Sequence, residues 1–114
     1  MAAVLNTVVY PVKDAERAKP VYAALLGVEP YADEPYYVGF RLGGQELGLD
    51  PNGHSRGLTG PTCYWEVDDI EASLERLVAA GAEVDHPVTD VGGGKRIASV
   101  KDADGNVTGI AQSP

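Results

Sequence analysis

The segment Thr62–Gly81, TCYWEVDDIEASLERLVAAG, has the pattern of a short strand followed by an amphipathic helix. Its first five residues suit a strand, and Asp68 or Asp69 is a suitable N-cap for the helix. Apolar residues then recur with a 3.6-residue period, and Gly81 is typical of a helix end. The residues predicted to share the packed face of this helix are Ile70, Leu74, Leu77 and Val78.

A weaker copy of the same plan, TVVYPVKDAERAKPVYAALLG, occupies Thr7–Gly27. Thr7 and Asp14 fall on Thr62 and Asp69 of the later segment, and Gly27 falls on Gly81 after a one-residue slip inside the helix. Val8, Val9 and Tyr10 are apolar on both faces, which predicts a strand buried on both sides. The predicted helix stripe is Ala15, Ala18, Tyr22, Leu25 and Leu26.

Each copy continues into strand-like segments separated by glycine turns, Gly43-Gly44 in the first and Gly92 to Gly94 in the second. Each therefore reads βαβββ, and a unit of roughly 55 residues buries too little surface to be stable alone. We predict an α+β fold in which residues 1–114 form one domain. Module one covers about 4–50, a turn-rich linker covers 51–61, and module two covers about 62–112.

Composition excludes several classes of partner. The net charge of −8 repels phosphate backbones, so we expect no nucleic-acid partner. No apolar run approaches membrane-spanning length, and no basic start precedes an apolar segment, so we expect no membrane partner. The single cysteine, Cys63, allows no intrachain disulfide, which fits a cytoplasmic location.

The chain resembles the vicinal oxygen chelate superfamily, which includes glyoxalase I, extradiol dioxygenases and bleomycin-resistance proteins. The resemblance rests on the repeat and on four strings: VKD at 12–14, YAALLG at 22–27, VDDI at 67–70 and KDADGN at 101–106. It implies two βαβββ modules whose curved mixed sheets enclose a pocket, with the helices outside. It also implies a homodimer for a chain of this length, against the alternative of a monomer whose two modules cover each other. We expect the dimer contacts around Tyr31 to Phe40 and His54, because exposed aromatic residues there would otherwise form an apolar patch.

Metal-dependent members of that superfamily hold a divalent ion with four side chains, a histidine or glutamine in the first strand and a glutamate in the last strand of each module. The corresponding positions here are Thr7, Gly48, Thr62 and Gly109. Threonine is a poor ligand and glycine has no side chain, so we expect no metal and no other cofactor. We expect the two glycines to enlarge the pocket.

Glu66 is the sharpest candidate for chemistry, because alternation places it on the same strand face as Thr62 and Tyr64. An enclosed carboxylate there would have a raised pKa and would serve as a base or bind a cation. The competing interpretation is a solvated glutamate at a strand end.

Tyr36, Tyr37 and Phe40, with Arg41, are candidates for stacking on an aromatic ligand and holding an anionic group, against the alternative of ordinary sheet packing. His54 in the linker is a candidate ligand contact that would titrate near neutral pH, although an exposed loop histidine explains it equally simply. His86 beside Pro87 is interpreted as a surface residue.

Two functions follow from these residues. The first is a metal-free protein that binds or sequesters a small amphipathic or aromatic ligand through Tyr37, Phe40, Arg41, His54, Thr62, Tyr64 and Glu66. The alternative is a glyoxalase-like enzyme that uses acid–base side chains such as Glu66 in place of the metal. A third option is a degenerate module that serves as an interaction domain.

Overall fold

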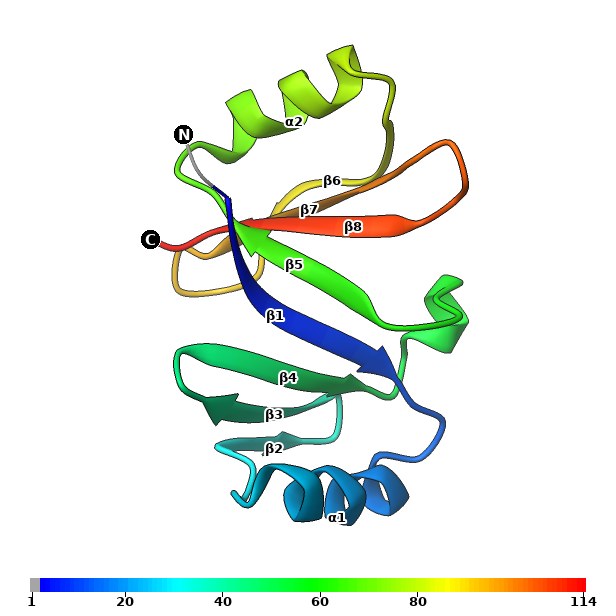
Figure 1. Cartoon of the computed structure of the whole chain (residues 1–114), viewed down its shortest axis with the longest axis vertical. Coiled ribbons are helices and arrows are strands. Elements are labelled where there is room, and N and C mark those ends of the chain that lie inside the picture. The colour runs from blue at the N-terminus through cyan, green and yellow to red at the C-terminus, as the bar shows by residue number, and fades with distance from the viewer. Residues whose placement is uncertain (1–2) are drawn as a thin grey trace. The chain divides into compact units, whose positions relative to one another are not determined.

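The computed structural model describes residues 3–114. In chain order, its elements are β1 (Val4–Pro11), α1 (Ala15–Leu26), β2 (Ala32–Glu34), β3 (Tyr37–Leu42), β4 (Gln45–Asp50), the short 3-10 helix η1 (His54–Arg56), β5 (Thr62–Glu66), α2 (Ile70–Ala79), β6 (Glu83–Asp90), β7 (Arg96–Lys101) and β8 (Val107–Gln112) (Figure 1). The chain divides into two compact units, Asn6–Thr62 and Cys63–Pro114, the second including the first few residues. Each unit is described separately below.

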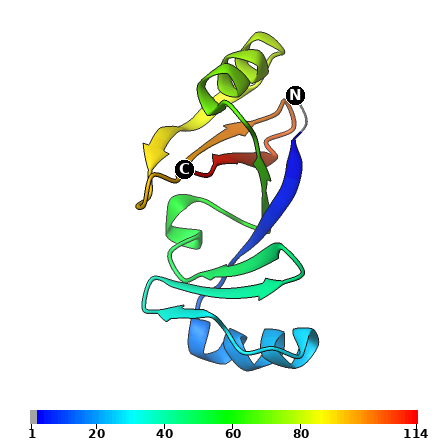
Figure 2. The same ribbon diagram turned by 90° about the vertical axis from the view of Figure 1, so that its left-hand side faces the viewer.

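In the first unit the strand order is β2-β3-β4-β1. β1 runs parallel to β4, whereas β2, β3 and β4 are antiparallel neighbours. α1 packs along β3 and β4 on one face of this sheet (Figures 1 and 2). The core between helix and sheet is built on Val38, Phe40 and Leu49, which are almost completely buried.

The limits of α1 follow from its two ends. The Asp14 carboxylate accepts hydrogen bonds from the backbone N–H groups of Glu16 and Arg17, at 3.0 and 3.3 Å, and Gly27 ends the helix in a left-handed conformation with φ 73°. The predicted stripe is wrong at one position, because Leu25 is 72% exposed and Ala23 packs on the core instead. These two residues lie on opposite edges of the stripe, and the sheet meets the Ala23 edge.

In the second unit the strand order is β5-β8-β7-β6, with β5 parallel to β8 and the other neighbours antiparallel. α2 packs against β6, β7 and β8 around Ile70, which is completely buried. Asp69 caps the helix through the Ala72 N–H, and the Gln112 side chain accepts from the Ile70 N–H at 2.8 Å. Val78 was predicted in the packed face but is 46% exposed, because it lies at the edge of the stripe marked by Ile70, Leu74 and Leu77.

The predicted α+β fold with two βαβββ units is therefore confirmed. The aromatic stretch before the Gly43-Gly44 turn forms two strands, β2 and β3, and the Pro87 strand β6 lies at the end of its strand order. The prediction of a first strand buried on both sides is wrong, since Val8, Val9 and Tyr10 are only half-buried. Among the described residues, no helix is both long and apolar enough to span a bilayer.

Candidate functional site

The face of the first sheet opposite α1 carries a group of polar and aromatic side chains. Strand pairing sets Gly39 opposite Gly48 and Arg41 opposite Glu46, while Phe40 and Leu47, one residue away in each strand, point to the helix-side core. Tyr37 has the same parity as Gly39 and Arg41, so it also lies on the face opposite α1. Alternation along β3 and β4 thus brings one tyrosine, a cation and a carboxylate to one surface, and the Tyr31 hydroxyl reaches the same carboxylate from outside these strands.

Glu46 is the centre of this group. Its Oε2 accepts a hydrogen bond from the Tyr31 hydroxyl at 2.7 Å and another from the Tyr37 hydroxyl. Its Oε1 faces Arg41 Nε at 3.9 Å, which is longer than a hydrogen bond. The Arg41 guanidinium lies 3.8 Å above the centre of the Tyr31 ring. We call Tyr31, Tyr37, Arg41 and Glu46 the Glu46 cluster.

Two glycines provide the floor on which the tyrosine rings lie. A Cβ on Gly39 would meet the Tyr31 ring at 2.8 Å and the Tyr37 ring at 2.9 Å, and a Cβ on Gly48 would meet the Tyr37 ring still more closely. The rings therefore need glycine beneath them in order to reach Glu46. The expectation that Gly48 enlarges a pocket is wrong, because the Tyr37 ring fills the space that a side chain would occupy.

The phenols of the cluster are held in their neutral form. Burial, followed by the hydrogen bond to Glu46 and its negative charge, raises the pKa of Tyr31 to about 12. The same causes in the same order raise the pKa of Tyr37 well above its usual range. At neutral pH both hydroxyls are therefore donors, and Glu46 is the acceptor between them.

This arrangement has the chemistry of a binding surface. Both phenols donate to Oε2, Oε1 lies 3.9 Å from Arg41 Nε, and the Glu46 side chain is 17% exposed. Tyr31 is 46% exposed and offers an aromatic face that already carries one cation, Arg41. A carboxylate beside aromatic faces favours an aromatic or amphipathic molecule that has a donor or a positive charge.

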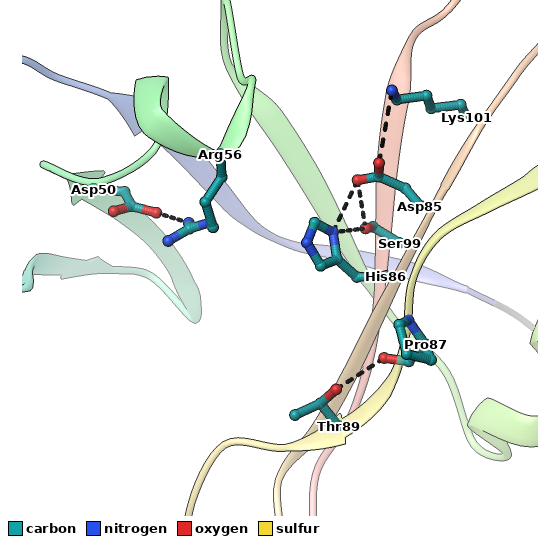
Figure 3. A network of polar contacts seen from close by, with 8 residues as sticks. All are labelled: Asp50, Arg56, Asp85, His86, Pro87, Thr89, Ser99 and Lys101. Atoms are coloured by element: carbon teal, nitrogen blue, oxygen red, sulfur yellow. Dashed lines mark hydrogen bonds and ion pairs between the residues drawn. The ribbon is translucent and has the colours of Figure 1, made fainter.

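The end of β4 holds the beginning of the linker in a fixed turn. Asp50, which is buried, forms an ion pair with Arg56 (Figure 3). It also accepts from the Asn52 N–H at 2.8 Å. The Ser55 hydroxyl donates to the Asn52 carbonyl at 2.8 Å. This part of the linker is therefore tied to its own strand end, and His54 lies exposed at the start of η1.

The other predicted ligand contacts have different surroundings. Phe40 is completely buried in the core beneath α1, so its ring is not on the face that carries Tyr37 and Arg41. Thr62 is 2% exposed at the start of β5. Tyr64 lies across Gly109, its partner in β8, and its ring fills the space of a side chain there as Tyr37 does over Gly48.

Glu66 lies at the end of β5 and is held by the segment after β8. Its Oε2 accepts from the Ser113 backbone N–H at 2.7 Å, and its Oε1 accepts from the Ser113 hydroxyl at 3.1 Å. Both carboxylate oxygens thus have a partner that is 47 residues away in the sequence. This pairing gives Glu66 a structural task in joining β5 to the chain after β8.

The residues at the four family metal positions do not fit a divalent ion. The Thr7 hydroxyl donates to the Asn6 side chain at 2.7 Å, and tyrosine rings cover Gly48 and Gly109. Within residues 3–114 no three His, Cys, Asp or Glu side chains are grouped so as to hold a metal. The donor set required for such a site is missing at these positions.

Comparison with known families places the chain in one of them. The family model of the Glyoxalase/Bleomycin resistance protein/Dioxygenase superfamily matches residues 4–110, so the chain belongs to that superfamily. The resemblance seen in the sequence is thereby confirmed. A comparison with curated proteins gives no match.

Solved structures show the same fold at low identity. A superfamily member from Vibrio splendidus 12B01 is 18% identical with a TM-score of 0.72, covering 98% of this chain and 100% of that one. A variant of methylmalonyl-CoA epimerase from Streptomyces coelicolor, in complex with 2-nitronate-propionyl-CoA, is 17% identical with a TM-score of 0.74, covering 98% and 96%. A Legionella pneumophila structure described as an NAD-dependent benzaldehyde dehydrogenase is 18% identical with a TM-score of 0.75, covering 96% and 99%.

Proposed function

We propose that this chain is a small-molecule-binding member of its superfamily that works without the family metal. The ligand is a small aromatic or amphipathic molecule with a cationic or hydrogen-bond-donating group. Glu46 Oε1 accepts from that group, and the Tyr31 and Tyr37 rings contact the apolar part. The single observation that carries the proposal is the pairing of both phenols with Oε2, which orients Oε1 toward a ligand.

Charge and exposure support a ligand of this kind. Arg41 is 69% exposed and stacks on Tyr31, so a cation already rests where a ligand cation would sit. An exposed side chain can move aside at small energetic cost. The net charge of −8 also favours a cationic over an anionic ligand at a distance.

The test compares benzylamine, benzyl alcohol and benzoate in a thermal-shift titration. We expect the amine to stabilise the protein most and benzoate least. Benzylamine at a free concentration of 100 times its Kd should raise the free energy of unfolding by about 2.7 kcal/mol. Glu46→Gln should abolish the preference for the amine. The matched control is Glu29→Gln, which removes the same charge from an exposed position of the same unit.

Two outcomes would overturn the proposal. One is tighter binding of benzoate than of benzylamine by the unaltered protein. The other is an equal response of the Glu46→Gln and Glu29→Gln variants to benzylamine.

The alternative proposal is a glyoxalase-like enzyme with Glu66 as acid–base group. The Ser113 contacts would have to open before Glu66 could reach a substrate. Glu66→Gln separates the two functions once a substrate is known, since unchanged turnover excludes the catalytic role.

We also propose a cytoplasmic homodimer. In the first unit Tyr36 and Leu42 are 65% and 47% exposed, β2 is the terminal strand, and a second copy would cover this apolar surface. Light scattering at micromolar concentration tests the proposal. A mass near 12.0 kDa rejects the dimer, and twice that mass supports it.

A further inference from the structure

A second polar group lies on β6 and β7, outside the Glu46 cluster. Asp85 Oδ2 is 3.0 Å from His86 Nδ1 and accepts from the Ser99 hydroxyl at 3.1 Å (Figure 3). Ser99 Oγ is also 3.4 Å from His86 Nδ1, and Lys101 Nζ is 3.7 Å from Asp85 Oδ1. We call Asp85, His86, Ser99 and Lys101 the His86 group.

An irregularity in strand pairing makes this group. The register of β6 against β7 shifts on both sides of His86, which is itself paired with Ser99. In a regular strand, consecutive side chains point to opposite faces, but a bulge can turn two neighbours toward one partner. Here Asp85 and His86 both contact the Ser99 hydroxyl, and Pro87, which has no N–H to donate, follows directly.

The two contacting side chains, Asp85 and His86, differ in how far they are exposed to solvent. The side chain of Asp85 is 19% exposed, whereas that of His86 is 57% exposed. Figure 3 shows the second ring nitrogen of His86 on the side of the ring away from Asp85 and Ser99. A carboxylate at Nδ1 favours a proton on that nitrogen, which leaves the Nε2 lone pair directed outward.

The charges around Asp85 keep it ionised. Burial acts to raise its pKa, but the hydrogen bonds from His86 and Ser99, with the charges of His86 and Lys101, together lower the pKa of Asp85 below its ordinary value. An ionised Asp85 accepts a hydrogen bond from His86 Nδ1–H at 3.0 Å, and this contact holds the ring with Nε2 as the remaining acceptor.

We propose that His86 is a second binding site, which takes a small weak acid such as a phenol or an enol. The ligand O–H donates to His86 Nε2. On proton transfer the O–H bond breaks, its electron pair stays on the ligand oxygen, and the new imidazolium lies between Asp85 and the ligand oxyanion. Asp85 and Ser99 are positioning residues that hold the ring, and Lys101 balances the charge of Asp85. This site is independent of the Glu46 cluster.

The probe is p-nitrophenol, whose anion absorbs visible light and so reports proton transfer directly. We expect the unaltered protein to increase the phenolate fraction in slightly acidic buffer and to shift the ring signals of His86 in NMR spectra. His86→Gln should abolish the added phenolate. Asp85→Asn, which keeps the shape but not the charge, should weaken binding at least about tenfold.

The matched control is Thr89→Val, because Thr89 is exposed on the same strand and its hydroxyl donates only to the Pro87 carbonyl, at 3.0 Å, among the contacts that the described residues show for it. This variant should behave as the unaltered protein does. Circular dichroism checks that each variant folds.

Several results would overturn the proposal. These are an unchanged phenolate fraction with the unaltered protein, equal losses in His86→Gln and Thr89→Val, and ring shifts at His54 in place of His86. A nitrogen-correlated NMR spectrum that places the neutral His86 proton on Nε2 would also overturn it, since that nitrogen would then be a donor. The His86→Gln variant should still be stabilised by benzylamine, so the p-nitrophenol experiment tests the His86 site separately from the Glu46 cluster.

Discussion

The two halves of the molecule share the same strand pairing, but the cation of each half meets a carboxylate on a different neighbouring strand. In the first half Arg41 of β3 pairs across the ladder with Glu46 of β4. In the second half the corresponding strand β7 ends in Lys101, whose partner in β8 is Val107. Lys101 instead approaches Asp85 of β6 on its other side, at 3.7 Å. The cation therefore occupies the corresponding position, Arg41 or Lys101, in both halves. The sequence of the neighbouring strands determines whether its partner is Glu46 or Asp85.

The carboxylates also differ in the groups around them. Glu46 is surrounded by phenols that stay neutral to high pH, so the first cluster changes charge on the alkaline side. Asp85 lies beside a histidine and a lysine, so the second group changes charge on the acid side. One feature is common to both halves, a tyrosine ring lying on a glycine of the last strand, Gly48 or Gly109.

The largest expected effect tests that common feature. Gly109→Ala should lower the free energy of unfolding by about 1–3 kcal/mol, because its Cβ would collide with the base of the Tyr64 ring, which cannot swing away. Gly48→Ala should cost less, since its Cβ would meet the tip of Tyr37, which can move. Urea denaturation measures both.

A double variant controls for general damage by the new methyl group. Tyr64→Ala combined with Gly109→Ala should recover part of the loss, since the colliding ring is then absent. Equal costs at Gly48 and Gly109, or strictly additive losses in the double variant, would contradict this account of the rings.

The next effect concerns the alkaline side of the first cluster. Folding raises the pKa of Tyr31 to about 12 from an ordinary 10.0, so its contribution to stability is complete below pH 10 and is lost as pH rises toward 12. Glu46→Gln should lower the pKa of both phenols, because it removes a negative charge and a charged acceptor. Ultraviolet absorbance of phenolate against pH, measured for the unaltered protein and the variant, gives the change. An unchanged titration curve in Glu46→Gln would show that Glu46 does not raise the pKa of these phenols.

The sequence alone predicted the repeat, the Asp14 cap, a second cap at Asp68 or Asp69 and the βαβββ order, since these depend on local patterns within each unit. It did not identify Glu46 as a site, although alternation already separated Glu46 from Leu47 and Leu49. The missing information was the register that brings Tyr31 and Tyr37 over Gly39 and Gly48, which is a tertiary property. An available signal was a glycine in each of two successive strands, which often marks close approach of a side chain.

The His86 group was missed for a related reason. A histidine before a proline in a terminal strand is usually solvated, and the expected alternation separates it from Asp85. The bulge reverses that expectation by setting both beside Ser99, and bulges are not encoded in a two-residue period. Phe40 shows the opposite error, because alternation assigns it to the core although its neighbours suggested a ligand site.

A smaller effect is expected on the acid side of the second group. The pKa of Asp85 is lowered in the folded state, so its contribution to stability is present above its unfolded value of 3.8 and is lost as pH falls through the folded value. Asp85→Asn should therefore make unfolding less dependent on pH below about 4, while Glu83→Gln, on the same strand and exposed, should not. Urea midpoints measured across this range test the difference. Parallel curves for the two variants would show that Asp85 has no such coupling.

The smallest expected effects are changes in stability when Arg41 and Lys101 are each replaced by the other kind of cation. Arg41 is 69% exposed and holds a stacking contact with Tyr31 besides its distant approach to Glu46, whereas Lys101 has the Asp85 contact and is 47% exposed. Arg41→Lys keeps the charge but loses the planar group, and should cost about 0.5–1 kcal/mol if stacking is the main contribution. Lys101→Arg should change stability by less than about 0.5 kcal/mol, because an exposed ion pair of this length is weak and either cation can form it. Thermal unfolding in low and high salt tests the assignment: the Arg41→Lys loss should persist in high salt, and a loss that disappears there would assign Arg41 to the ion pair and not to the ring.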